Sequence, residues 1–413
     1  MRHSGAANVL CYRVFCAVVC TVRRRDSNGA EAASMPCARR DRSPTLDDNQ
    51  TRGKPMKRFA RGMISLAAAM LVSSVTSIGA WAEDVQLLPP GLIAPSSKDI
   101  IPEGKFKKAP PWKIGLAFPG VGNTWIVQML QEMKYEASLN KNIGEFTVLE
   151  ADWKPAKQVA DIEDLMARNV DLLIVAPIAF PVVAAQVDKA VAKGIPVVVF
   201  GASNGELNGT LEVFGGGGAF GRVGGEFLAK ELKGKGSIWA VRGVAGVGEE
   251  VLRYEGFKKA IAGTDIKIVA EVFGDWNYAK SKQLCENLVL SGKPVDGIWF
   301  SGAEMTRACI EVFKEAGKPL VPMTGEGNNG FFKIWKSSGV KSVAPVFTPG
   351  LGPAVVRASV ALLEGKQMYK GYFSDPAPIT NADIDKYYRP DLNDAYWVPS
   401  TLPEAKLKEL FGK

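Results

Sequence analysis

The stretch from Asp171 to Phe200, DLLIVAPIAFPVVAAQVDKAVAKGIPVVVF, decides the fold class of this chain. It begins and ends with apolar runs rich in Val and Ile, at 171–176 and 196–200. Its middle part, at 183–193, has apolar residues at helical spacing. Continuous apolar strands that alternate with amphipathic helices are typical of a parallel sheet covered on both faces. The stretch therefore predicts one strand–helix–strand unit of an α/β protein.

The same alternation extends over most of the chain. Further strand-like runs lie at 113–118, 146–149, 237–241, 266–273, 297–300, 320–324 and 340–346. Nine or so strands divide naturally into two doubly wound, Rossmann-like lobes with parallel sheets. We interpret the glycine run Gly215–Gly218 as a flexible loop between the lobes.

These patterns predict the domain boundaries. We expect an irregular N-terminal arm at 83–111, because that segment is rich in Pro, Lys and Gly. The N-terminal lobe is expected to comprise 112–215 and 348–377. The C-terminal lobe and tail are expected to comprise 216–347 and 378–413.

Residues 56–82 have the pattern of a secretion signal. A basic start, MKRFAR, is followed by the apolar run MISLAAAMLV at 63–72 and by the small-residue motif AWA at 80–82. We therefore expect export and cleavage after Ala82. Residues 1–55 are expected to be a non-native extension from a mis-set start, and a genuine cytoplasmic extension is the alternative.

The basic charge of the chain belongs to the segment before the predicted cut. The chain has 51 Lys+Arg and 43 Asp+Glu, of which residues 1–82 hold 13 and 5, so the rest carries 38 of each. A nucleic-acid partner is therefore not expected. The single histidine, His3, also precedes the cut, and we expect neither a metal site nor a cofactor.

Two cysteines, Cys285 and Cys309, follow the predicted cut. Both fall in predicted helices of consecutive α/β units. They would be able to pair in an oxidising compartment, and two buried thiols are the other interpretation. The sequence leaves both open.

Three motifs that resemble enzyme signatures lack the partners that their chemistry needs. Residues 201–205, GASNG, match the nucleophile elbow G-x-S-x-G, but no histidine follows the cut to activate Ser203. Residues 216–221 match the dinucleotide fingerprint, but the next strand ends without an acidic residue for a ribose. The pair Glu249-Glu250 lies in a helical pattern and is interpreted as a solvated face. We therefore expect no catalytic residues.

Ligands of open α/β sheets bind outside the carboxyl ends of the strands. Aromatic residues follow several predicted strands, accompanied by Asn, Asp, Glu and Arg. Aromatic faces cover C–H surfaces and the polar groups bond hydroxyls, so this combination suits a polyhydroxylated ligand. Core packing is the alternative for any one tryptophan. The candidate ligand-binding residues are Asn123, Trp125, Asp152, Arg253, Trp276, Glu326, Asn328 and Phe347.

The chain from about 113 to 373 resembles the ribose-type sugar-binding proteins of ABC importers, which are type I periplasmic binding proteins. Six motifs in the expected order carry the resemblance. They are KIGLAFPGVGNTW at 113–125, DWKPAKQVADIEDLMARNVDLLIVAP at 152–177, KGIPVVVF at 193–200, RGVAGVGEEVLRYEGFKKAI at 242–261, DGIWFSGAEM at 296–305 and ALLEGK at 361–366. The resemblance implies two lobes joined by three crossing strands, which close on the ligand by a hinge.

The resemblance also implies roles for individual residues. Asn123 and Trp125 fall where the family has an Asn and a stacking aromatic residue. Arg253 falls on the pocket arginine of the family, and Trp276 on the aromatic residue of the opposite lobe. Glu326 replaces the usual aspartate.

Other positions depart from the family pattern. Gly201-Ala202 replaces an Asp-Arg pair, Gly302 replaces an Asn and Phe347 replaces a Gln. The pocket thereby loses hydroxyl partners and gains aromatic surface, which argues against ribose itself.

The resemblance implies a monomeric periplasmic receptor that delivers a sugar or polyol to an ABC transporter permease in the inner membrane. Two other functions stay open at this point. One is a secreted hydrolase or lyase acting on a small carbohydrate, which predicts turnover. The other is a sensory receptor that presents its ligand to a chemoreceptor or sensor kinase.

Overall fold

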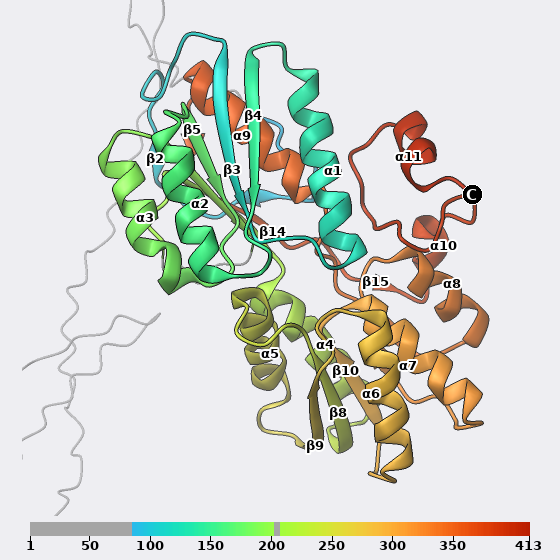
Figure 1. Cartoon of the computed structure of the whole chain (residues 1–413). Coiled ribbons are helices and arrows are strands. Elements are labelled where there is room, and N and C mark those ends of the chain that lie inside the picture. The colour runs from blue at the N-terminus through green and yellow to red at the C-terminus, as the bar shows by residue number, and fades with distance from the viewer. Residues whose placement is uncertain (1–84, 202–206) are drawn as a thin grey trace, which may run out of the picture. The chain divides into compact units, whose positions relative to one another are not determined.

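The computed structural model describes residues 85–201 and 207–413 (Figure 1). The signal pattern at 56–82 with its cut after Ala82, the extension at 1–55 and the motif residue Ser203 lie outside the described residues.

The first lobe is built on a seven-stranded sheet in which every strand is parallel to its neighbours except the edge strand β1. The strands, in order across the sheet, are β1 (Ala94–Pro95), β14 (Gly371–Ser374), β7 (Leu211–Gly215), β6 (Val197–Gly201), β5 (Leu172–Val175), β3 (Trp112–Phe118) and β4 (Ile143–Glu150). Its helices are α1 (Thr124–Leu139), α2 (Pro155–Ala167), α3 (Phe180–Ala192) and α9 (Leu351–Glu364).

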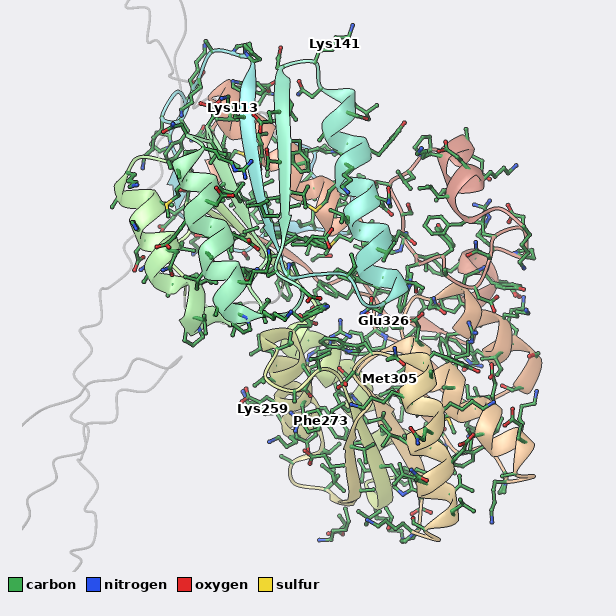
Figure 2. All side chains as sticks on the ribbon, in the orientation of Figure 1. Lys113, Lys141, Lys259, Phe273, Met305 and Glu326 are labelled. Atoms are coloured by element: carbon green, nitrogen blue, oxygen red, sulfur yellow. A yellow bond between two sulfur atoms is a disulfide. The ribbon has the colours of Figure 1, made fainter. Side chains whose placement is uncertain are left out.

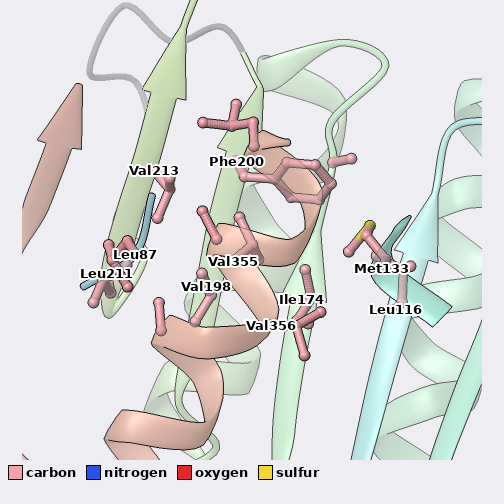
Figure 3. Packing of buried hydrophobic residues seen from close by; sticks show 14 of the residues in the cluster. Leu87, Leu116, Met133, Ile174, Val198, Phe200, Leu211, Val213, Val355 and Val356 are labelled. Atoms are coloured by element: carbon pink, nitrogen blue, oxygen red, sulfur yellow. The ribbon is translucent and has the colours of Figure 1, made fainter. Parts of the chain in front are cut away.

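Side chains of the central strands alternate between two helical layers. Ile174 and Val198 pack on one face with α1 and α9, where Val355 and Val356 lie against them (Figure 3). Their sequence neighbours on β5 and β6 pack on the other face with α2 and α3. Burial on both faces explains why these strands read as continuous apolar runs.

The second lobe is built on a six-stranded sheet, again parallel except for one edge strand, β15. The strands, in order, are β15 (Ile379–Thr380), β12 (Ser342–Ala344), β11 (Met323–Thr324), β10 (Gly297–Phe300), β8 (Lys235–Arg242) and β9 (Asp265–Phe273). Its helices are α4 (Gly217–Glu231), α5 (Gly248–Ile261), α6 (Tyr278–Leu290), α7 (Ala303–Glu315), α8 (Asn329–Ser338), α10 (Ile384–Tyr387) and α11 (Glu404–Phe411). The predicted α/β architecture with two parallel lobes is confirmed.

The described chain crosses between the two sheets at 215–217, 344–351 and 374–379. The first crossing corrects our interpretation of the glycine run as a flexible loop, because Gly217 already begins α4. A Cβ atom on Gly221 would lie 1.8 Å from the carbonyl oxygen of Arg253, and one on Gly256 would lie 2.1 Å from that of Gly218. The glycines therefore let the backbones of α4 and α5 touch, which accounts for the spacing that mimics a dinucleotide fingerprint.

The N-terminal arm is more ordered than its composition predicts. Besides β1, it contains β2 (Ile100–Ile101), which pairs with β13 (Met368–Tyr369) in a separate two-stranded sheet. Leu87 and Leu88 are buried in the core of the first lobe. The apolar residues of the arm have partners far along the chain, which a local pattern does not reveal.

Cys285 of α6 and Cys309 of α7 form a disulfide, with their Cα atoms 5.4 Å apart. Of the two interpretations left open by the sequence, the structure has the paired one. None of the helices in the described part of the chain has the length and apolar character needed to cross a membrane.

Candidate functional site

A cavity of about 110 Å³ lies where the carboxyl ends of the two parallel sheets face each other. One water molecule needs ~10–15 Å³ by this kind of measure, so the cavity has room for a molecule of monosaccharide size. Six of the eight predicted site residues line it, and they come from both lobes. They are Asn123, Trp125, Arg253, Trp276, Glu326 and Phe347.

Two predicted site residues do not line the cavity. The side chain of Asp152 is 74% exposed and pairs with Lys154, so it faces solvent. Asn328 is fully buried and caps α8, accepting from the Phe331 N–H at 2.9 Å and donating to the Asp394 carbonyl at 3.0 Å. Its side chain is used to hold the helix and the C-terminal tail, which corrects its assignment to ligand binding.

Asn123 has a double role at the start of α1. Its Oδ1 accepts from the Ile126 N–H at 3.0 Å, which caps the helix, and the side chain also lines the cavity. The amide nitrogen is the group left to donate to a ligand.

Two tryptophans occupy equivalent positions in the two lobes. The pattern Asp-Trp-x-x-Ala-Lys occurs at 152–157 after β4 and at 275–280 after β9, and each copy leads into a helix. Trp153 and Trp276 both line the cavity. Trp153 follows a predicted strand but is absent from the eight candidates, and this repeat is the signal that would have added it.

Both tryptophans have left-handed backbones, with φ of 56° for Trp153 and 51° for Trp276. Such a conformation costs a residue other than glycine about 1–3 kcal/mol and is concentrated at functional sites. Each indole is held by a backbone carbonyl: Trp153 Nε1 donates to Val121 at 3.1 Å, and Trp276 Nε1 to Ser301 at 2.9 Å. The strain is therefore fixed by surrounding contacts, and it directs both rings toward the cavity.

Glycine makes room for Trp276. A Cβ atom on Gly243 would lie 2.3 Å from the indole, and one on Gly302 would lie 2.8 Å from it. The glycine at 302, where the family pattern has an Asn, is thus explained by the position of this ring.

A third aromatic element closes the cavity from the α1 side. Trp125 stacks on Phe347 with ring centroids 4.6 Å apart and an interplanar angle of 20°. Trp125 Nε1 also donates to the Phe347 carbonyl at 2.7 Å. This contact joins the start of α1 to the crossing segment after β12.

Arg253 is buried and forms the polar centre of the site. It donates to Glu249, to the Ser301 carbonyl at 2.5 Å and to Glu326 at 3.3 Å. Its guanidinium lies 3.7 Å from the centroid of Phe220. Burial raises the pKa of Glu326 to about 7, although Arg253 opposes this shift. Glu326 lies at the edge of the lower lobe that faces the upper one (Figure 2).

Two carboxylates that line the cavity, Glu249 and Glu304, were missed by the sequence reasoning. Glu249 lines the cavity with a side chain only 14% exposed, and Glu250 is buried against Arg242 at 2.6 Å. The interpretation of this pair as a solvated face is therefore wrong. A charge pair in a helical pattern gave no signal of burial because the partners, Arg253 and Arg242, come from tertiary packing.

Glu304 is the second missed carboxylate. It accepts from Thr124 Oγ1 at 2.9 Å, which joins α7 of one lobe to α1 of the other. Burial raises the pKa of the Glu304 carboxyl. Its position just after β10 is the one signal that pointed to it.

The C-terminal tail contributes Trp397 to the cavity wall. Gln128 of α1 accepts from the Trp397 N–H at 2.8 Å and donates to its carbonyl at 3.0 Å. Trp397 Nε1 donates to Thr124 Oγ1 at 2.7 Å. The tail thereby binds the helix of the first lobe that begins at the cavity.

The site thus combines aromatic faces with buried carboxylate, guanidinium and amide groups, which is the chemistry that holds hydroxylated molecules. Within residues 85–201 and 207–413, no group of three or more His, Cys, Asp and Glu side chains is placed to hold a metal ion.

Comparison with known proteins identifies the family. The profile of the periplasmic binding protein domain matches residues 114–367. The chain belongs to this family. Among its curated relatives, the chain is similar to the ribose import binding protein RbsB of Haemophilus influenzae, with 27% identity over 62% of this chain and 87% of that protein.

Solved structures of other solute-binding proteins have the same fold. A solute-binding protein of an ABC transporter from Thermobispora bispora has a TM-score of 0.62 at 24% identity, covering 72% of this chain and 94% of that one. A Bacillus halodurans solute-binding protein with bound myo-inositol has a TM-score of 0.60 at 22% identity, covering 68% and 98%.

Proposed function

We propose that this chain is a periplasmic solute receptor that captures a sugar or polyol between its lobes and delivers it to an ABC transporter permease. The observation that carries the proposal is the cavity at facing strand ends, lined by indoles from both lobes around the buried Arg253–Glu326 pair. The names of relatives support the ligand class, since one imports ribose and a structural neighbour holds myo-inositol.

In this proposal Trp125 and Trp276 cover the two faces of the ligand, and Asn123, Arg253 and Glu326 bond its hydroxyls. Micromolar affinity needs about −8 kcal/mol. Three or four hydrogen bonds to charged groups at ~1.5–3 kcal/mol each, with stacking, supply this after the costs of association.

The ligand touches both lobes only when they are closed, so binding shifts the population toward the closed form. One of these lobes comprises residues 112–215 and 348–377, and the other comprises residues 216–347 and 378–413. The permease recognises the closed form. The mature protein is a monomer in the periplasm, and its first residue is Glu83. The proposal includes no catalytic step, so the ligand is recovered chemically unchanged after incubation.

A thermal-shift screen of pentoses, hexoses, polyols and small glycosides tests the proposal. A ligand at 100 times its dissociation constant adds ~2.7 kcal/mol to the free energy of unfolding. We expect at least one compound to raise the melting temperature of the wild-type protein. A screen in which none does, or in which a compound is converted to a product, would contradict the proposal.

A further inference from the structure

The charged side chains around the cavity do not balance. Among the described residues that line it, three are glutamates, Glu249, Glu304 and Glu326, and one is a base, Arg253. Because the pKa of Glu326 is about 7, the excess of negative charge at pH 6.5 rests on Glu249 and Glu304 against this one base. A cavity between closed lobes excludes water, and an uncompensated charge there is costly. The excess of negative charge therefore needs a compensating group when a ligand fills the site.

Arg253 is already used by two of the three carboxylates. Its Nε donates to Glu249, and its Nη2 lies 3.3 Å from Glu326. A third nitrogen, Nη1, donates to the Ser301 carbonyl at 2.5 Å. A further contact, from Nη1 to Glu326 Oε2 at 3.5 Å, leaves one N–H of Nη2 unused. Among the described residues, no hydrogen bond or ion pair joins the guanidinium to Glu304.

Glu304 receives one hydroxyl, from Thr124, and no salt bridge in the part of the chain that the structure describes. Arg307, one turn along α7, is a base whose charge acts on the Glu304 carboxyl. Its guanidinium lies 3.3 Å from Asp394 and 3.6 Å from Glu311, so it is directed to other acids.

Glu249 also has a carboxylate oxygen that lacks a hydrogen-bond donor among the described residues. Its Oε1 accepts from the Gly217 N–H at 3.0 Å and from Arg253. Its Oε2 is buried and has no hydrogen-bond partner among the described residues. A buried carboxylate oxygen without a donor is expensive, so a donor from the ligand would be stabilising.

The walls of the cavity suit a cation as well as a sugar ring. Four indoles and two phenyl rings line it: Trp125, Trp153, Trp276, Trp397, Phe200 and Phe347. The face of an aromatic ring carries partial negative charge and attracts an ammonium group, most strongly when both are desolvated.

Building on the proposed function, we infer that the ligand carries a cationic amine on a polyhydroxylated frame, as in an amino sugar or an amino polyol. The ammonium group donates to Glu304 and Glu249 and offsets the excess of carboxylates. The hydroxyls bond to Asn123, Arg253 and Glu326. A neutral sugar would fill the same space but leave the negative charge uncompensated.

Calorimetric titration with matched pairs at pH 6.5 tests the inference. The pairs are D-glucosamine with D-glucose, D-galactosamine with D-galactose, and 1-amino-1-deoxy-D-sorbitol with D-sorbitol. For the pair that binds, we expect the amine to bind at least tenfold more tightly than its hydroxyl counterpart. Equal or tighter binding of the hydroxyl compound overturns the inference and leaves the proposed function standing.

The remaining outcomes of these titrations also test the inference and the proposed function. If neutral compounds of the thermal-shift screen bind and no amine does, the inference is wrong. If no sugar, polyol or amine binds at all, the proposed function fails together with it.

Two variants of α7 test whether Glu304 is a carboxylate that favours binding of the amine. In Glu304→Gln the affinity ratio of amine to hydroxyl compound should fall by about tenfold. In Glu315→Gln, which removes a carboxylate exposed on the same helix and paired with Lys282, the ratio should be that of the wild type. An unchanged ratio in Glu304→Gln would remove this residue from recognition of the amine.

Discussion

At the scale of the residue, Arg253 holds together a buried cluster of charges. It is almost fully buried and pairs with Glu249 and Glu326, which are themselves buried or nearly so. A buried ion pair adds little net stability compared with apolar residues, but removing one partner leaves the others uncompensated. The cluster therefore makes this one guanidinium critical for folding as well as for binding.

We expect Arg253→Ala to lower the free energy of unfolding by about 3–5 kcal/mol, measured by urea denaturation. The matched control is Arg222→Ala, which removes an exposed arginine paired with Glu226 one turn along its helix. Such surface pairs contribute ~0.2–1 kcal/mol. Equal losses in the two variants would show that the cluster does not depend on Arg253.

Glu326 should make stability depend on pH. Burial raises its pKa from the usual 4.5 of a glutamate carboxyl to about 7 in the folded protein, and Arg253, Glu249 and Glu304 are the charged groups that act on it. A raised pKa stabilises the folded state fully below pH 4.5, and that contribution is lost as pH rises through 7.

The unfolding free energy should therefore fall by about 3 kcal/mol between pH 4.5 and 7 because of this group. In Glu326→Gln that slope should be shallower, whereas Glu226→Gln on the surface controls for the loss of a carboxylate. Urea denaturation at several pH values measures it. A slope unchanged by Glu326→Gln would mean that Glu326 does not retain its proton in the folded protein.

At the scale of the element, the turn after β8 sets the position of Trp276, which begins the turn into α6. Gly243 follows β8, and a Cβ atom there would lie 2.3 Å from the indole. Gly243→Ala should displace the ring and weaken ligand binding at least tenfold while the protein stays folded. Gly218→Ala is the control, because its Cβ would meet only an ordinary contact at 3.9 Å. Calorimetry compares the two, and wild-type affinity in Gly243→Ala would contradict the positioning role.

The disulfide is a second device at this scale, since it joins α6 and α7. The two cysteines are 24 residues apart in sequence. Closing a loop of that length stabilises the folded state by about 3.5 kcal/mol in the chain-entropy estimate. The double variant Cys285→Ala/Cys309→Ala should lose that amount, and a reducing agent should destabilise the wild type but not the variant. Thermal unfolding with and without reductant checks this, and an unaffected wild type would argue against the bond.

Some elements of the fold could be predicted from the sequence, and others could not. The strands buried on both faces were predictable, because each carries its own apolar pattern, as at 171–176. The two-residue strands of the N-terminal arm were not, because their partners lie more than 250 residues away along the chain. The residues at the cavity that follow strands were largely predictable. Asn328 was not separable from them, because an asparagine after a strand is also a helix cap.

At the scale of the whole molecule, the lobes are linked by more than the crossing segments. The tail after β15 returns to α1 of the first lobe (Figure 1), where Gln128 binds both backbone groups of Trp397. Glu132 of the same helix accepts from Ser400 at 2.7 Å. The resemblance to the ribose-type family covers the chain only to about residue 373, so it carries no expectation for this contact. Movement of the lobes must take place with the tail attached to both.

The most direct measurement is a calorimetric titration of the tightest ligand from the thermal-shift screen into three proteins. The wild type should bind one ligand per chain. Trp276→Ala should bind at least tenfold more weakly, because the indole forms a wall of the cavity, and Asp152→Asn should bind like the wild type, because its side chain faces solvent. Wild-type affinity in Trp276→Ala would contradict a ligand site between the lobes.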